Sequence, residues 1–505
     1  MSDIVKISTC LVSVYNKQGL DKIVKKLNDY NVKIISTGGT KDYIEKLNIK
    51  VQPVESLTTF PSILGGRVKT LHPKVFGGIL ARRNNNNDNN ELIEYEIPEI
   101  DMVIVDLYPF EETLKNTNVE EEIIEKIDIG GISLIRAAAK NFNDVFVISD
   151  RSQYDDLLII LEKGPETDKK TRKLFASKAF AVSSRYDTLI YNYFSEENDN
   201  LRIAIDDKTI LRYGENPHQK AVFWGDIFHC FDQLHGKQLS YNNFLDIEAA
   251  IRLISEFDDT VFAIIKHNNP CGIACDNILV EAWKKALAGD PVSAFGGILA
   301  SNRRIDLSTA EEINKIFFEV IIAPDFDLDA LQILKQKKNR IILKLKNNDL
   351  PGSNLRSLLS GYLWQEQDSL NISKDSLQTV TNKKPNEREM EDLLFANKVV
   401  KHCKSNAIAL VKNKMLVANG IGQTSRVDAL RQAIAKANGF GFDLNSAVMA
   451  SDAFFPFADS VEIAHAAGIS AVIQPGGSVR DKDSINYCNE NNIAMVFTGI
   501  RHFKH

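Results

Sequence analysis

The sequence predicts an α/β protein that divides into two domains, residues 1–197 and 198–505. Buried apolar runs alternate with amphipathic helical patterns over roughly the first 150 residues, which is typical of a parallel sheet covered by helices on both faces. At 505 residues, the chain is too long for one typical core. A polar, acidic run at residues 195–200 lacks any apolar side chain, so we place the boundary there.

In the first domain, residues 7–15 are the first predicted strand, residues 20–30 an amphipathic helix and residues 32–36 the second strand. Such an order predicts ligands at the carboxyl ends of the strands. Residues 84–90, nearly all asparagine, predict an exposed and mobile loop. The other elements expected here are a helix ending at residue 47, strands at 102–105 and 145–149, and helices at 132–140, 152–163 and 168–194.

The composition excludes several classes of protein. Hydrophobic residues make up 44% and charged residues 25%, as in ordinary globular proteins. A net charge of -6 argues against broad nucleic-acid binding. The sequence has no signal-like start and no long apolar run, so we expect a cytoplasmic enzyme that does not bind membranes. The six scattered cysteines are expected to be reduced thiols.

Two loops of the first domain suit an anionic ligand. Residues 37–40, Thr-Gly-Gly-Thr, join a strand to a helix, where glycines, hydroxyls and free helical N–H groups can hold a phosphate. A plain strand-to-helix turn is the alternative. Residues 65–74 gather Arg67, Lys69 and Lys74 behind two glycines, a concentration of cations that favours an anion in an acidic protein.

The densest cluster of reactive groups is at residues 264–272, where an apolar strand runs into Lys266, His267 and two asparagines. These supply a cation, an acid/base active near neutrality and amide donors. The following Pro-Cys-Gly, residues 270–272, is expected to turn the chain away. A solvated polar turn is the alternative.

Zinc is a further possibility, because His267, Cys271 and Cys275 are spaced by four and four. The Pro-Cys pair is similar to the Pro-Cys-x-x-Cys of zinc deaminases. However, three residues separate these cysteines, and no His-x-Glu precedes them. The pattern therefore argues against a zinc site.

Several long motifs, in order along the chain, resemble one family. They are GGRVKTLHPKV, LYPFEET, IDIGG with RAAAKN, LRYGENPHQ, KHNNPCG, DPVSAFGG, SDAFFPFAD and the terminal TGIRHFKH. On these motifs the chain is identified as a member of the bifunctional purine-biosynthesis enzymes. This family combines 5-aminoimidazole-4-carboxamide ribonucleotide (AICAR) formyltransferase with inosine monophosphate (IMP) cyclohydrolase, and the similarity runs essentially end to end.

The resemblance implies the last two steps of IMP synthesis. The C-terminal domain would transfer a formyl group from 10-formyltetrahydrofolate, as co-substrate, to AICAR, and the N-terminal domain would close formyl-AICAR to IMP. It implies a methylglyoxal-synthase-like first domain and cytidine-deaminase-like α/β units without zinc in the second. It further implies a homodimer that requires no metal.

For formyl transfer, the resemblance implies that His267 relays a proton, that Lys266 stabilises developing charge and that Asn406 positions the substrate. The remaining residues expected at this site bind substrate, and they are Arg212, Tyr213, His218, Gly296, Glu319, Arg426, Phe454, Asp459, Ser478, Val479, Arg501 and His505. The C-terminal tail is either disordered or tucked into this site.

For cyclisation, the resemblance implies that Lys69, Tyr108, Asp128 and Lys140 are catalytic. Because the helix at 132–140 separates Asp128 from Lys140, the two can meet only if the helix starts late or if they reach the ligand from different sides. The nucleotide-binding residues expected here are Ser13, Tyr15, Asn16, Lys17, Thr37, Gly38, Gly39, Thr40, Arg67, Val68, Thr70, Asp106, Leu107 and Ile129.

The sequence departs from the family pattern at three positions. Asp106 stands where the family usually has asparagine, which removes an amide donor and adds a negative charge near the ligand. Phe76 replaces a usual histidine, and Ile421 makes a glycine-rich loop bulkier. Two rival functions remain, a catalytically silent nucleotide-binding protein and a zinc deaminase.

Overall fold

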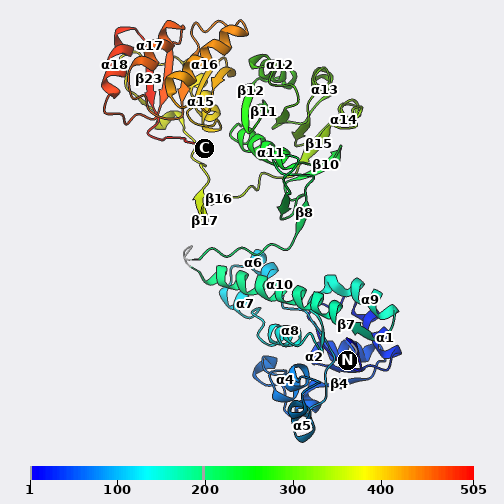
Figure 1. Ribbon diagram of the computed structural model, residues 1–505. Helices are drawn as coiled ribbons and strands as arrows, with labels where there is room; N and C mark the ends of the chain where they lie inside the picture. Colours follow the sequence, from blue (N-terminus) through cyan, green and yellow to red (C-terminus); the bar gives the residue numbers. More distant parts are fainter. Residues whose placement is uncertain (1–2, 196–199) are drawn as a thin grey trace. The chain divides into compact units, whose positions relative to one another are not determined.

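The computed structural model describes residues 3–195 and 200–505. It divides the chain into two compact units, Met1–Asp206 and Asp207–His505 (Figure 1). The boundary predicted between residues 197 and 198 lies outside the described residues. The two units are described separately below as the N-terminal unit and the C-terminal unit.

The N-terminal unit is built on a five-stranded sheet in which every neighbouring pair is parallel. The parallel sheet predicted from the strand–helix alternation is therefore confirmed. In spatial order its strands are β4 (Val51–Pro53), β3 (Lys33–Ser36), β2 (Thr9–Ser13), β5 (Met102–Val105) and β6 (Phe146–Ile148).

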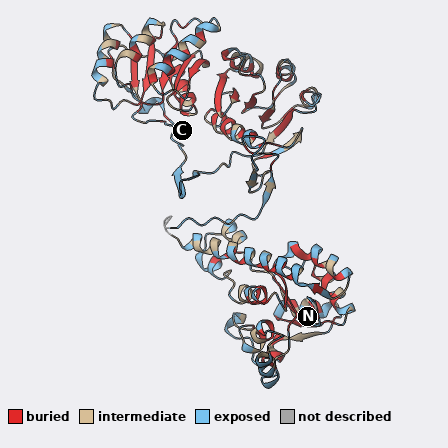
Figure 2. Cartoon of the chain, in the orientation of Figure 1, coloured by how far each residue is buried: buried red, intermediate tan, exposed pale blue. Residues whose placement is uncertain are grey.

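Helices cover both faces of this sheet, as expected. One face packs on α1 (Leu20–Asp29), α2 (Gly38–Lys46) and α9 (Tyr154–Glu162), and the other on α3 (Val54–Thr58), α4 (Pro73–Leu80) and α8 (Gly130–Lys140). The long helix α10 (Lys169–Phe194) serves both cores, because Phe175 joins one and Ala176 the other. Figure 2 shows the buried strands between exposed helical faces.

Three sequence predictions for this unit were wrong in detail. The strand predicted at 7–15 is shorter, because β2 spans Thr9–Ser13, and a separate strand β1 (Ile4–Lys6) precedes it. The helix predicted from residue 132 begins at Gly130. The loop predicted at 84–90 is largely helical, because Asn85 caps α5 (Asn86–Glu94) by accepting from the N–H groups of Asn87 and Asp88.

The remaining elements of this unit lie at its periphery. The strand β1 pairs antiparallel with β7 (Glu166–Asp168). Two short helices, α6 (Phe110–Asn116) and α7 (Glu120–Ile124), lie between β5 and α8 along the chain, and they pack with α10 through Phe110, Ile123 and Tyr186.

The C-terminal unit contains a twelve-stranded sheet, ten strands of which come from two copies of one motif, α-β-β-α-β-α-β-α-β. The first repeat is α11 (Tyr241–Ile254), β11 (Val261–Lys266), β12 (Asn269–Cys275), α12 (Leu279–Gly289), β13 (Ile298–Ser301), α13 (Leu307–Ile313), β14 (Val320–Ala323), α14 (Leu328–Lys335) and β15 (Ile341–Leu345). The second is α15 (Glu387–Lys401), β19 (Ile408–Lys412), β20 (Met415–Gly420), α16 (Arg426–Gly439), β21 (Val448–Ser451), α17 (Asp459–Ala466), β22 (Ala471–Gln474), α18 (Asp481–Glu490) and β23 (Ala494–Phe497).

Strand pairing is the same in both repeats. Each opens with an antiparallel hairpin, adds a third strand antiparallel to the first, and continues with two parallel strands. The repeats meet where β12 pairs antiparallel with β20, through Ala274 and Met415. This pairing brings the start of β12 and the end of β20 to the same edge of the sheet.

The two faces of this sheet differ in how they are covered. One face packs on α11 and α15 in a single core that spans both repeats. The opposite face has a separate core in each repeat, under α12 to α14 in the first and under α16 to α18 in the second (Figure 1). The repeats therefore share one continuous core on the face covered by α11 and α15.

Between the repeats, β16 (Ser353–Leu358) and β17 (Gly361–Glu366) form a hairpin that pairs with no other strand among those described. Its apolar side chains are exposed, with Tyr362 at 64% and Leu363 at 60%. The two edge strands of the twelve-stranded sheet are β10 (Phe231–His235), which pairs with β15, and β18 (Gln378–Thr379), which pairs with β23. A separate antiparallel pair is formed by β8 (Lys208–Ile210) and β9 (Val222–Trp224). No helix in the described ranges is long and apolar enough to cross a membrane.

Because each unit has its own hydrophobic cores, we expect fragments 1–206 and 207–505 to fold separately. Each should be soluble and should melt cooperatively by circular dichroism. A cut at residue 160, inside α9, is the matched control, since it removes Leu161 and Phe175 from one core of the N-terminal unit. Aggregation of both natural fragments would contradict independent folding.

Candidate functional sites

In the N-terminal unit, predicted site residues gather where the parallel strands β2, β3 and β5 end. Ser13 is the last residue of β2, and its hydroxyl lies 2.9 Å from that of Thr37, which follows β3. The Thr40 hydroxyl donates to the carbonyl of Val14 at 2.9 Å and accepts from its N–H. These contacts hold the loops after β2 and β3 together at the start of α2.

The loop that contains Lys69 and Thr70 closes on this edge of the sheet. A Cβ atom at Gly38 would lie 4.0 Å from the Lys69 ammonium, and one at Gly130 would lie 3.2 Å from the Thr70 hydroxyl. Gly38 has a φ of 36°, a backbone conformation that side chains disfavour. The glycines therefore let the loop approach the first turns of both α2 and α8.

Asp106, directly after β5, holds the turn after β2. Its carboxylate accepts from the N–H groups of Tyr15 and Asn16, the latter at 3.0 Å. Burial raises the pKa of Asp106, while these N–H groups and Lys17 oppose the rise. The Asp106 carboxylate therefore shapes the site as a hydrogen-bond acceptor. The sequence analysis considered only the amide donor lost, and the charge gained, when aspartate replaces the usual asparagine.

Lys17 and Lys69 place two ammonium groups near one another at this site. The Lys17 ammonium donates to the carbonyls of Val14 and Tyr15, both at 2.8 Å. Burial lowers the pKa of Lys17, and the charge of Lys69 lowers it further, although Asp106 acts in the opposite sense. An anionic ligand here would relieve this repulsion.

Asp128 lies at the first turn of α8, where its carboxylate accepts from the Gly131 N–H at 2.6 Å. Burial raises its pKa, and Lys69 is among the groups that oppose the rise. Tyr108 packs edge-on against Tyr15 at 5.5 Å, and the Lys126 ammonium lies over both rings. Asp128, Tyr108 and Lys69 thus share one site, and Lys126 is a cation there that the sequence analysis missed.

Two predicted residues stand apart from this cluster. Arg67 is exposed and forms an ion pair with Glu125. Lys140 is the last residue of α8, about 15 Å along the helix from Gly130. Of the two routes by which Asp128 and Lys140 could meet, a late helix start is excluded, because α8 begins at Gly130. Of the other predicted residues, Gly39 lies in the first turn of α2, and Val68, Leu107 and Ile129 lie in the loops that form the site.

In the C-terminal unit, the polar cluster after β11 is a tight hairpin turn. His267 and Asn268 are its two central residues, with φ values of 52° and 64°, the geometry of a type I′ turn. The prediction that residues 270–272 turn the chain was wrong, because they belong to β12. The turn instead leaves His267 exposed at the sheet edge.

Lys266 and Asn269 tie this turn to its neighbours. The Lys266 ammonium donates to the Phe295 carbonyl at 2.8 Å, and a Cβ at Gly296 would lie 3.2 Å from it. The Asn269 side chain accepts from the Lys404 N–H at 2.9 Å. The catalytic candidates Lys266 and His267 of the first repeat thereby meet the loop of the second repeat that carries Asn406.

Arg426, the first residue of α16, is buried next to the loop that carries Asn406. Its guanidinium donates to Asn406 at 3.0 Å and to Ser451 at 2.8 Å, and it forms a 2.7 Å ion pair with Asp452. Burial lowers the pKa of Arg426, and Asp452 opposes this. The guanidinium is enclosed, so Arg426 positions Asn406 in this structure and does not present a fork to solvent.

The C-terminal tail is tucked against the same loop. Ser405 and Lys504 exchange two hydrogen bonds, from the Ser405 N–H to the Lys504 carbonyl and from the Lys504 N–H to the Ser405 hydroxyl. His502 is buried and lies 2.6 Å from the Asp368 carboxylate. Of the two alternatives for the tail, the ordered one is therefore correct, and Arg501 and His505 are held on exposed positions next to it.

The remaining predicted residues line several loops of this unit. Arg212 stacks on Tyr213, with 4.7 Å between guanidinium and ring, and both lie in the segment before α11. Glu319 accepts from the Asn243 side chain at 3.0 Å. Exposed on other loops are His218, Phe454 and Val479, whereas Asp459 begins α17 and Ser478 precedes α18.

The two cysteines of the zinc alternative pack in different cores. Cys271 joins the core under α12, and Cys275 joins the core on the opposite face of the sheet. Burial raises the pKa of each thiol to about 12, so both stay protonated at neutral pH. The pair cannot share one ion. Within residues 3–195 and 200–505, no group of three His, Cys, Asp or Glu side chains is arranged to hold a metal.

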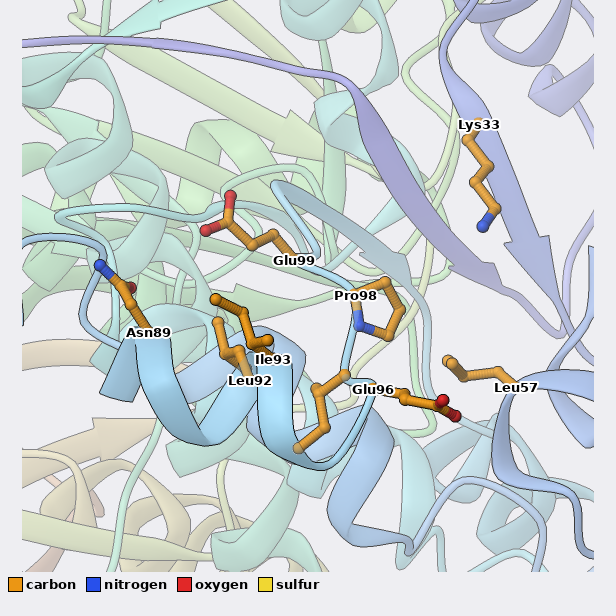
Figure 3. Close-up of a pocket in the computed structure, with 9 residues that line it drawn as sticks. Lys33, Leu57, Asn89, Leu92, Ile93, Glu96, Pro98 and Glu99 are labelled. Atoms are coloured by element: carbon orange, nitrogen blue, oxygen red, sulfur yellow. The ribbon is translucent and has the colours of Figure 1, made fainter. Parts of the chain in front are cut away.

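A hollow of about 540 Å³ in the N-terminal unit lies away from these residues (Figure 3). Lys33, at the start of β3, and Pro98 and Glu99, before β5, form one side of it, and Leu92 and Ile93 of α5 form the other. It is therefore at the amino edge of the sheet, opposite the cluster around Lys69, and none of the predicted site residues lines it.

Several residues that shape the sites were not predicted from the sequence. Each is an ordinary polar residue inside a helix, strand or loop, and its role depends on contacts made over long sequence separations. They are Lys126, Asn243, Asp246, Ser405 and Asp452.

Comparison with known proteins gives the family. A family described as AICARFT/IMPCHase bienzyme matches residues 138–436, and one described as MGS-like domain matches residues 19–133. The N-terminal unit thus carries an MGS-like domain, in agreement with the sequence prediction.

Curated relatives match along the whole chain. A bifunctional purine biosynthesis protein PurH from Bacteroides thetaiotaomicron is 60% identical over 507 residues and covers 100% of both chains. Its namesake from Caldicellulosiruptor bescii is 49% identical over 513 residues, covering 98% of this chain and 99% of its own. A solved structure titled "Crystal structure of ForH" covers 37% of this chain and 98% of its own, with 33% identity and a TM-score of 0.33. On the family match and the full-length relatives, this chain belongs to the AICARFT/IMPCHase bienzyme family.

Proposed function

We propose that this chain catalyses the final two steps of IMP synthesis, formyl transfer to AICAR in the C-terminal unit and cyclisation of formyl-AICAR in the N-terminal unit. The observation that carries this proposal is that each unit has its own cluster of a lysine, a proton-transfer group and polar positioning residues at a sheet edge. The chain is thus a bifunctional enzyme of purine biosynthesis.

In formyl transfer, the AICAR amine attacks the formyl carbon of 10-formyltetrahydrofolate. The new N–C bond forms while the bond from carbon to N10 breaks, the amine loses a proton, and N10 gains one to give tetrahydrofolate. His267, exposed on its turn, is the group that accepts the amine proton. Lys266, held at 2.8 Å by the Phe295 carbonyl, stabilises the negative charge on the tetrahedral oxygen.

In cyclisation, the carboxamide nitrogen attacks the formyl carbon of the same molecule, and water is lost. Because the reaction is intramolecular, positioning supplies much of the rate. The loops after β2, β3 and β5 bind the nucleotide, with Lys17 and Lys69 as cations for its phosphate or developing charge. Tyr108 and Asp128 are the proton-transfer groups.

We extend the proposal to the type of fold in the C-terminal unit, the absence of zinc, a homodimer and a cytoplasmic location. The repeated α-β-β-α-β-α-β-α-β unit supports a cytidine-deaminase-like origin for the C-terminal unit. The cores that enclose Cys271 and Cys275 support chemistry without zinc. The exposed apolar side chains of β16 and β17 support a homodimer. The proposed substrates are those of a cytoplasmic enzyme.

The proposal is tested by incubating the purified chain with AICAR and 10-formyltetrahydrofolate. We expect release of tetrahydrofolate and formation of IMP, and neither product would appear with a silent nucleotide-binding protein. A zinc deaminase would instead contain stoichiometric zinc by elemental analysis.

His267→Ala should lower the rate of formyl transfer roughly 1,000-fold, because it removes the group that takes the amine proton. The same protein should cyclise supplied formyl-AICAR at the wild-type rate, since that site lies in the other unit. Equal loss of both activities would argue against two separate sites.

Lys69→Ala should have the opposite effect, lowering cyclisation about 100-fold while formyl transfer continues. Lys140→Ala is the matched variant, since it removes the same charge from the far end of α8. We expect the smaller loss from Lys140→Ala. A loss from Lys140→Ala as large as that from Lys69→Ala would show that Lys140 reaches the ligand from another side.

Tyr108→Phe should lower cyclisation roughly 100-fold. Burial, followed by the charges of Asp128 and Glu125, raises the pKa of Tyr108 above its usual 10.0. The hydroxyl therefore stays protonated over the neutral range. The pH profile of cyclisation from pH 6 to 9 should have the same shape in the wild type and in Tyr108→Phe, and a basic limb that vanishes in the variant would contradict this assignment.

A further inference from the structure

Asp246, the sixth residue of α11, contacts the turn that carries His267. Its carboxylate accepts from the Asn268 N–H at 2.5 Å. Three titratable groups act electrostatically on this carboxylate. They are Lys266 at the end of β11, His267 in the turn after it, and Glu319, the residue directly before β14. Burial raises the pKa of Asp246, and the Asn268 N–H, His267 and Lys266 oppose this rise.

The second repeat contains the same arrangement without a histidine. Asp392, six residues into α15 as Asp246 is into α11, accepts from the N–H groups of Asn413 and Lys414 at 2.9 and 2.6 Å. These two residues are the central pair of the β19–β20 turn, with φ values of 55° and 52°. In both repeats, an aspartate on the helix before the hairpin therefore holds a turn whose two central residues have positive φ values.

The two aspartates differ in how their charge is balanced. Asp392 forms a 3.0 Å ion pair with Arg388, one turn earlier on its own helix. The matching position before Asp246 is Asn242, whose side chain donates to the Glu215 carbonyl. No ion pair to Asp246 is found within the described ranges. The basic groups that act electrostatically on its carboxylate are Lys266 and His267.

We propose that Asp246 is a positioning residue for formyl transfer. Through the Asn268 N–H it fixes the turn that presents His267, and its carboxylate favours the imidazolium that forms when His267 accepts the amine proton. Asp392 retains only the first of these roles, because the second repeat has Asn413 where the first has His267. This inference rests on the proposed formyltransferase function.

The test uses the full chain with two substitutions at Asp246 and one at Asp392. Asp246→Asn keeps an acceptor oxygen for the turn but removes the charge, whereas Asp246→Ala removes both. We expect kcat for formyl transfer to fall about tenfold in the first and about 100-fold in the second, with KM for AICAR changed less than about twofold. Asp392→Asn, the matched control, should leave kcat for transfer unchanged.

A double-mutant cycle separates positioning from general damage to the fold. If Asp246 acts through His267, Asp246→Asn should lower transfer no further in the His267→Ala background. An equal loss in that background, or wild-type transfer by Asp246→Asn, would overturn the inference. Melting of each preparation by circular dichroism, compared with the wild type, reports whether the C-terminal unit is folded. Absence of transfer in the wild type would overturn the proposed function and this inference with it.

Discussion

The functional turns of both units depend on carboxylates that accept backbone N–H groups at a sheet edge. Asp106 holds the turn after β2, Asp128 the start of α8, Asp246 the turn after β11 and Asp392 its counterpart in the second repeat. A hydrogen bond to a charged acceptor contributes about 1.5–3 kcal/mol, which is enough to hold residues such as His267 in a left-handed conformation.

The burial of these carboxylates lowers the free energy of unfolding. Burial raises the pKa of Asp106, Asp128 and Asp246, so the folded state binds their protons more readily than the unfolded state does. The stability linked to these protons is complete below the usual pKa of 3.8 and is lost as the pH rises through the raised values. Ionising these three carboxylates in the folded state therefore costs folding free energy.

Sequence periodicity predicted the N-terminal sheet because its strands are short apolar runs separated by amphipathic helices, a local signal. It failed at α5, where the cap supplied by Asn85 outweighs the low complexity of the asparagine run. Sequence periodicity does not reveal contacts between residues that are far apart along the chain. The motif that contains Lys266 and His267 could be located, but the aspartate that holds it is 22 residues away on another element. The enclosed state of Arg426 likewise depends on Asp452, which no spacing rule connects to it.

The internal duplication explains how one sheet yields a single transferase site. Lys412 of the second repeat donates to the Asp443 carbonyl as Lys266 donates to that of Phe295, so both repeats retain the lysine and its support. The hairpin residue that follows is Asn413 in one and His267 in the other, and only the histidine can move a proton near neutral pH. The second repeat contributes differently. The antiparallel pairing of β12 with β20 brings its Asn406 loop to the turn of the first repeat, where Asn269 anchors it. In the proposed mechanism, the first repeat thus supplies the proton-transfer group with its support from Asp246, and the second repeat supplies the positioning residue Asn406.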